Sequence, residues 1–93
     1  MLVTSILATA VTLVVIGGVI FVAIKYVINA KALKNIAHHQ CPDAWKIIIQ
    51  EKKQNAVRIG IFDENDNVET MEISSDEGVS NRLHEGQVIL LQK

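Results

Sequence analysis

The residue types best suited to hold a metal ion lie together in the run His38–Asp43, which reads HHQCPD. Imidazole nitrogens and a thiolate are ligands that zinc prefers. The spacing matches no standard paired zinc motif, because a second pair of Cys or His is missing and His84 is the only further candidate. We therefore expect no metal site and no cofactor, and we interpret Cys41 as a structural residue. A zinc enzyme remains an alternative that stoichiometric metal in purified protein would reveal.

Asp63, Asn65 and Asn67 alternate in the way that ligands do at the start of a calcium loop. Val68 replaces the required turn glycine and Ser74 replaces the closing glutamate, so the calcium pattern fails. The chain also carries no nucleophile motif, phosphate loop or dinucleotide fingerprint. A domain of about 50 residues can hardly enclose a pocket of several hundred cubic ångströms. The sequence therefore predicts a protein that is not an enzyme and has no small-molecule substrate.

The chain begins with an uncharged, proline-free run from Met1 to Ile24, which Lys25 and Tyr26 close. As a helix this run would reach about 36 Å, enough for a hydrocarbon core of roughly 30 Å. No basic residue precedes the run and no small-residue cleavage site follows it, so a retained anchor is favoured over a signal peptide. We predict a transmembrane helix over residues 1–28 that contacts membrane lipid.

Cations fix the predicted orientation of this span, because short loops rich in Lys and Arg stay in the cytoplasm. They follow the span and do not precede it, which places the N-terminus outside and the C-terminal domain in the cytoplasm. A lone cysteine agrees with a reducing compartment. The predicted membrane-interface residues are Lys25, Tyr26, Lys31 and Lys34.

One face of the predicted span consists of small, weakly polar residues at helical spacing. Such faces let helices approach closely in lipid, so this face predicts a contact with a partner helix or with itself. The alternative is that the hydroxyl groups bond to their own helix and face lipid. Gly17 and Gly18 add a close-approach point or a slight kink. The contact residues are Thr4, Ser5, Ala8, Thr9 and Thr12.

After the span, the helical period continues to a juxtamembrane helix over residues 29–40, which Pro42 ends. From Pro42 the apolar residues alternate, which predicts strands in a small β domain over residues 41–93. The clearest local prediction is a hairpin between residues 56–62 and 68–73, and a last strand covers 88–91. Trp45 is in phase with Ile47 and Ile49, so we expect it in the core. The predicted fold class is α+β, with a small antiparallel sheet of three or four strands after the helices.

A domain of this size buries only about 60% of its unfolded surface, so it is marginal alone. Ile48, Phe62 and one face of residues 88–91 also have no place in a sheet with a single buried face. We therefore expect the domain to pack on another protein or on a copy of itself. From Asp43 onward ten acidic residues face six basic ones, a net charge of −4, which would repel nucleic acid. The acidic run between Asp63 and Glu77 is interpreted as a solvated turn, with docking of a basic partner as the alternative.

The run Cys41–Trp45, which reads CPDAW, resembles the Cys-Pro-Asp-aromatic-Trp motif of small single-span membrane proteins of large double-stranded DNA viruses. Ala44 stands where an aromatic residue is common, and the further cysteines of those proteins are absent. The resemblance implies a structural virion membrane or minor capsid protein.

The function predicted from these patterns is that of a non-catalytic, single-pass membrane protein. It would act as a structural or interaction subunit of a larger assembly, with protein partners or copies of itself. The alternative is an accessory or regulatory subunit of a membrane enzyme or transporter, bound through the small face of the span.

Overall fold

A two-residue turn at Gly17 and Gly18 folds the first apolar segment back on itself. In the computed structural model, which describes residues 12–91, β1 (Thr12–Ile16) pairs antiparallel with β2 (Val19–Ile24). Both glycines have positive φ, 59° and 82°, as the tight turn of a two-residue hairpin requires. Eight of the 11 residues in the two strands are β-branched, and such residues pack well in strands.

This hairpin overturns the predicted membrane helix over residues 1–28. Residues 12–24 are two strands, and within residues 12–91 no helix has the length and apolar composition that a membrane crossing requires. The predicted single-pass localisation and its orientation are therefore wrong. The physical reason is that an uncharged run also suits a hairpin whose second strand is buried. The Gly-Gly pair inside the run breaks it at the point where two strands can turn.

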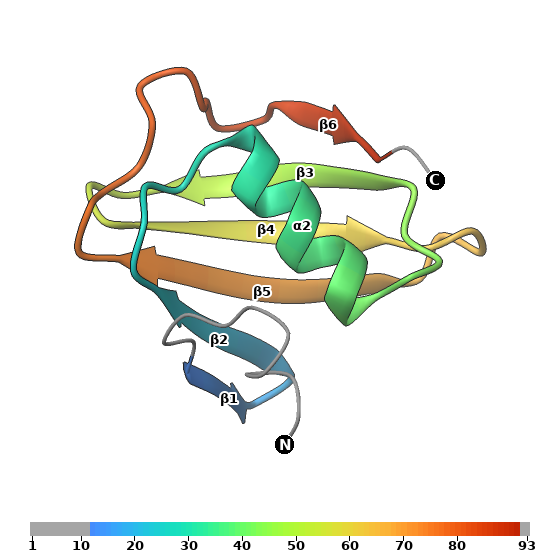
Figure 1. Cartoon of the computed structure of the whole chain (residues 1–93). Helices are drawn as coiled ribbons and strands as arrows, with labels where there is room; N and C mark the ends of the chain where they lie inside the picture. The colour runs from blue at the N-terminus through green and yellow to red at the C-terminus, as the bar shows by residue number, and fades with distance from the viewer. Residues whose placement is uncertain (1–11, 92–93) are drawn as a thin grey trace.

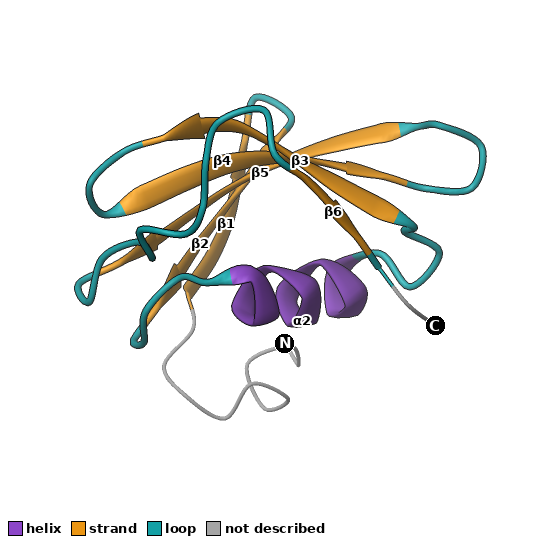
Figure 2. Cartoon of the chain, turned by 90° about the horizontal axis from the view of Figure 1, so that it is seen from above, coloured by secondary structure: helices purple, strands orange, loops and turns teal. Residues whose placement is uncertain are grey.

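Within residues 12–91 the structure has one α-helix, α2 (Ala30–Gln40). It lies across one face of the sheet (Figures 1 and 2). Asn29 caps its start, because its side-chain oxygen accepts a hydrogen bond of 2.8 Å from the amide of Ala32. The helix ends at Gln40, just before Pro42, and the amide of Cys41 donates to the carbonyl of Ala37. Its apolar stripe, Ala32, Leu33, Ile36 and Ala37, is buried. The helix therefore covers the sheet, whereas the sequence placed it beside a membrane.

Four further strands complete the sheet: β3 (Lys46–Lys52), β4 (Ala56–Phe62), β5 (Val68–Ser75) and β6 (Val88–Leu90). The strand order is β1-β2-β5-β4-β3-β6, so β5 and β4 are central and β1 and β6 are the edges. β2 runs parallel to β5, and the other neighbours are antiparallel. The sheet is thus six-stranded and mixed, and the predicted antiparallel sheet of three or four strands is wrong in both respects.

The core lies between α2 and the sheet face that α2 covers. Alternate residues of the strands point into it, including Ile20 and Val22 of β2, Ile59 of β4 and Met71 and Ile73 of β5. The segment after β5 adds Leu83, and Ile28 is held beside Val79 by an isolated bridge. Four residues of the supposed membrane span therefore supply core side chains: Ile20, Val22, Ile24 and Ile28.

Trp45 does not join this core, contrary to the sequence expectation. Its side chain is 39% exposed, whereas its neighbour Ala44 is fully buried. β3 begins only at Lys46, so the alternation that buries Ile47 and Ile49 does not extend back to Trp45.

Candidate functional site

The sheet face opposite α2, here called the outer face, is the most distinctive surface of the described residues. Figure 2 shows the helix on one side of the strands and no described element packed on the other. Strand alternation assigns the outer residues, because they are those between the buried ones. Its apolar members are Val14, Ile16, Val19, Phe21, Ile48, Phe62, Val68, Val88 and Leu90.

Register brings these apolar residues into rows across the strands. One row joins Leu90, Lys46, Phe62 and Val68 through successive pairings. The next row runs from Val88 through Ile48, Gly60, Thr70 and Val19 to Ile16. Val68, Val88 and Leu90 are half or more exposed. The side chains of the first row are apolar apart from Lys46, and those of the second row are apolar apart from Thr70.

An ion pair lies near the middle of this face, on the central strands β4 and β5. Arg58 and Glu72 are directly opposite each other, and the Arg58 Nη2 donates to Glu72 Oε1 at 3.0 Å. Nε of Arg58 donates to the same oxygen at 3.3 Å. The Glu72 side chain is 18% exposed, and the Arg58 side chain is 38% exposed. The two charges neutralise each other within the chain, and Glu51 of β3, opposite Arg58 in the register, adds a further acidic residue beside them.

A second cation lies against aromatic rings at one end of the outer face. The ammonium of Lys46 is 4.6 Å from the centre of the Trp45 ring and 4.9 Å from that of Phe62. Both distances suit a cation–π contact. The charged end of the Lys46 side chain thus lies over both aromatic rings.

Gly60 leaves a dent in the outer face that neighbouring side chains fill. A Cβ at this position would lie 2.8 Å from the side-chain nitrogen (Nε2) of Gln50 and 3.4 Å from side-chain atoms of Phe62 and Val68. The absent side chain lets these three residues meet over β4. The side chains of these three residues therefore fill the space above Gly60.

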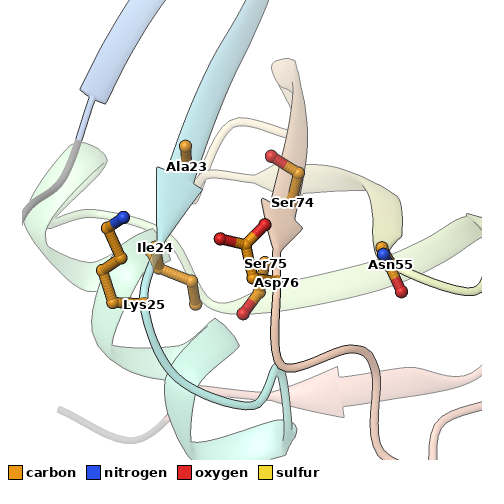
Figure 3. Close-up of a pocket in the computed structure, with 7 residues that line it drawn as sticks. All are labelled: Ala23, Ile24, Lys25, Asn55, Ser74, Ser75 and Asp76. Atoms are coloured by element: carbon orange, nitrogen blue, oxygen red, sulfur yellow. The ribbon is translucent and has the colours of Figure 1, made fainter.

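A shallow, open depression of about 360 Å³ lies on another part of the molecule, at the ends of the parallel strands β2 and β5. Figure 3 shows Asp76 between Lys25 on one side and Asn55 on the other. Ser75, which also lines it, is already used, because its hydroxyl donates to the Tyr26 carbonyl at 2.6 Å. The depression carries no arrangement of nucleophile and base.

The predicted membrane residues have other places in the fold. Thr4, Ser5, Ala8 and Thr9 lie outside the described residues, and Thr12 begins β1 opposite Ala23. Lys25 lies at the rim of the depression, and Tyr26 is half-buried against the core. Lys31 and Lys34 are on the exposed side of α2. Thr12 therefore lies in a strand and not in the predicted membrane helix.

The residues weighed as metal ligands do not converge. His38 and His39 are exposed at the last turn of α2, and in residues 12–91 no three His, Cys, Asp or Glu side chains form a metal cluster. Cys41 is free and half-buried. Burial raises the pKa of its thiol above the ordinary value of 9.0, and the Glu69 carboxylate adds to the rise. Cys41 is therefore a neutral thiol at physiological pH.

Asp63 organises the turn between β4 and β5 and holds no calcium ligand set. One carboxylate oxygen accepts hydrogen bonds from the amides of Asn65 and Asn67, at 2.8 and 2.9 Å. The other oxygen accepts from the side chain of Asn67 at 3.2 Å. Asp66 takes the left-handed conformation with φ of 63°. The spacing that resembled a calcium loop is thus a turn pattern.

The sequence identified only part of the outer face. Ile48, Phe62 and alternate residues of 88–91 were noted as apolar residues without a place, and they do lie on it. Val14, Ile16, Val19 and Phe21 were missed because they were assigned to a membrane helix. The Gly-Gly turn between two β-branched runs was the signal that could have placed them.

Comparison with known protein families, with curated proteins and with solved structures finds no match for this chain.

Proposed function

We propose that this chain is a non-catalytic structural subunit that assembles with a second copy of itself through the outer face. One observation carries the proposal: the described residues leave a full sheet face uncovered, with two mostly apolar rows beside an ion pair that forms within the chain. An exposed apolar surface of this kind is typical of an interaction site.

The size of the outer face suits such a contact. Six strands at about 4.8 Å spacing and three rows at about 6.6 Å give roughly 600 Å² per protomer. A typical specific interface buries about 800 Å² per partner. The largest apolar patch of an ordinary monomer is about 300–600 Å². Two outer faces packed about 10 Å apart would form an ordinary sheet-on-sheet contact.

The position of Arg58 and Glu72 favours a second copy over an unrelated partner. They lie on the two central strands, so a twofold axis through the middle of the face would bring both pairs together. Arg58 of each copy would then approach Glu72 of the other. Such a contact keeps an opposite charge beside each Arg58 and each Glu72 when the face is desolvated, which an apolar partner would not provide.

The other functions considered from the sequence lose their supporting features. The accessory subunit of a membrane enzyme or transporter depended on a small face of a membrane helix, and Thr12 of that face lies in β1. The resemblance to viral membrane proteins depended on a motif after a membrane helix. In the structure the run Cys41–Trp45 follows α2, which packs on the sheet. We carry neither function forward.

Sedimentation equilibrium of the full chain over a wide range of concentration tests self-association. We expect a reversible dimer in the wild type. Val68→Lys and Leu90→Lys should each weaken the dimer about tenfold or more, because both residues are exposed in the protomer and become desolvated in the contact. Asn81→Lys is the control, since it adds the same charge on an exposed loop. Emission of Trp45, the sole tryptophan, should shift to the blue with dimerisation.

A charge swap tests the symmetry of the contact. The double variant Arg58→Glu with Glu72→Arg keeps the ion pair within each copy and should still dimerise with itself. Mixed dimers with the wild type should form less often than by chance, because like charges then meet across the axis. A wild type that stays monomeric at all concentrations, or mixed dimers at the statistical ratio, contradicts the proposal. Association only with an added, different protein would assign the outer face to that partner instead.

A further inference from the structure

The outer edge of β1 is a second surface to which no strand of the described residues pairs. Edge strands of natural proteins usually carry charges, prolines or bulges that prevent association. β1 has no charge, no proline and a regular register with β2. Val15 and Ile16 are 59% and 64% exposed. The opposite edge, β6, has only three residues, so β1 is the longer open edge of the described sheet.

Hairpin geometry determines which backbone groups point to this edge. In a two-residue hairpin the pair that flanks the turn, here Ile16 and Val19, exchanges hydrogen bonds, and the pattern alternates along the strand. The amides of Val14 and Ile16 therefore point to β2. The amide of Val15 points away from β2, where the described residues place no other strand. Val15 thus offers a donor and an acceptor at the open edge.

We propose that β1 pairs antiparallel with β1 of a second copy, with Val14 of each copy opposite Val14 of the other. This register has a twofold axis through Val14 and perpendicular to the sheet, so the contact is closed and self-complementary. It gives the Val15 backbone groups of both copies a partner. Because residues 1–24 carry no charged side chain, two copies approach at this edge without like-charge repulsion.

A second copy fits this edge better than an unrelated strand. The axis keeps the same sheet face of both copies on the same side, so the two outer faces join into one larger apolar surface. The edge contact stands independently of the proposed function. Where both contacts form, the inference rests on that function as well, and the two self-complementary contacts then give a closed tetramer if their twofold axes meet at right angles, or an open-ended assembly if the axes do not meet.

Amide hydrogen exchange of the full chain, followed by NMR, tests the pairing. We expect the Val15 amide to exchange rapidly in dilute protein and to become protected as the concentration rises. The Val14 amide, which points to β2, should be protected throughout and is the internal reference. A Val15 amide that exchanges rapidly at every concentration overturns the proposal. Protection that is already complete in dilute monomer also overturns it, because the edge is then covered from within the same chain.

Two variants at one position separate the edge contact from the rest of the fold. Val15→Pro removes the amide that points to the edge and no amide that points to β2, so edge pairing should weaken about tenfold or more. Val15→Thr keeps the amide and the β-branch, and it should retain the concentration-dependent protection. Circular dichroism reports whether the proline variant folds. If it does not fold, Val15→Lys at the same exposed position gives the corresponding test.

The outer-face variant Val68→Lys distinguishes this contact from the proposed one. It should abolish face dimerisation and leave the concentration-dependent protection of Val15 unchanged. Loss of both effects in Val68→Lys would show that the edge protection follows from the face contact, and it would refute the edge pairing while sparing the proposed function. Edge protection in a wild-type protein that forms no face dimer would refute the proposed function alone.

Discussion

The hydroxyl of Ser75 donates a 2.6 Å hydrogen bond to the carbonyl of Tyr26, 49 residues away in the sequence. The hydroxyl oxygen of Ser75 also accepts a hydrogen bond of 3.1 Å from the backbone amide of Glu77. Ser75 is the one buried polar side chain among the described residues, and it lies at the end of β5. Together these bonds join the end of β5 to the segment that leads from β2 into α2. Ser75 therefore helps to fix where the helix crosses the sheet.

Ser75→Ala should lower the free energy of unfolding by about 1–3 kcal/mol, because a half-buried carbonyl and an amide both lose their partner. Ser74→Ala is the matched control, since Ser74 is the exposed neighbour on the same strand and should change stability by less than about 0.5 kcal/mol. Urea denaturation followed by circular dichroism measures both values. Equal effects of the two substitutions would contradict the role given to Ser75.

Gly17→Ala should destabilise the protein by about 1–2 kcal/mol, because an L-residue pays this cost in the left-handed conformation. A Cβ at Gly17 would meet no atom within 4 Å, so the cost is conformational and not steric crowding with neighbours. Gly17→Asn is the control and should be nearly neutral, because Asn followed by Gly suits the same turn. Thermal unfolding of the three proteins checks this order. In a helix, alanine at this position would instead be stabilising.

Local pattern predicted the elements that depend on near neighbours. Pro42 and the helical apolar spacing predicted where α2 ends, and its observed end at Gln40 lies at the predicted boundary. Its start at Ala30, after the Asn29 cap, was not predicted, because the helix was expected to continue from a membrane span. The hairpin of β4 and β5 was predicted within a few residues, because its strands alternate and its turn is rich in Asp and Asn. These features depend on residues a few positions apart, which is what a sequence pattern records.

The parts that depend on distant segments were not predictable in the same way. An uncharged run is equally compatible with a lipid bilayer and with a buried strand. Ile20 and Val22 therefore gave no signal that they would lie beside Met71 and Ile73 in a sheet. Parallel pairing of β2 with β5 joins residues about 50 positions apart. The outer face depends on that register, and only its β3, β4 and β6 parts could be suspected from surplus apolar residues.

Leu33→Ala should cost about 2–5 kcal/mol, the range observed for a buried leucine that leaves a cavity. Leu33 is completely buried between α2 and the sheet. Lys34→Ala, at the next position and exposed, is the control and should leave stability within about 0.5 kcal/mol of the wild type. A small effect of Leu33→Ala would mean that α2 does not pack as described. If the helix lay beside a membrane, as the sequence suggested, the two variants in aqueous solution would not differ in this way.

The carboxylate of Asp63 should titrate below its ordinary value of 3.8, because the amide of Asn67 and then that of Asn65 hydrogen-bond to the charged form and lower its pKa. A pKa that is lower in the folded state than in the unfolded state stabilises the fold above the unfolded pKa. This contribution is lost as the pH falls through the folded pKa. The difference in unfolding free energy between wild type and Asp63→Asn should therefore be constant near neutral pH and shrink below about pH 3.8.

NMR titration of the Asp63 carboxyl measures the pKa directly, and denaturation at several pH values measures the energetic difference. A difference for Asp63→Asn that grows on acidification would reverse the sign of the linkage. In that case the Asp63 turn would be held by the neutral acid, and its hydrogen bonds to Asn65 and Asn67 would not be those of a carboxylate.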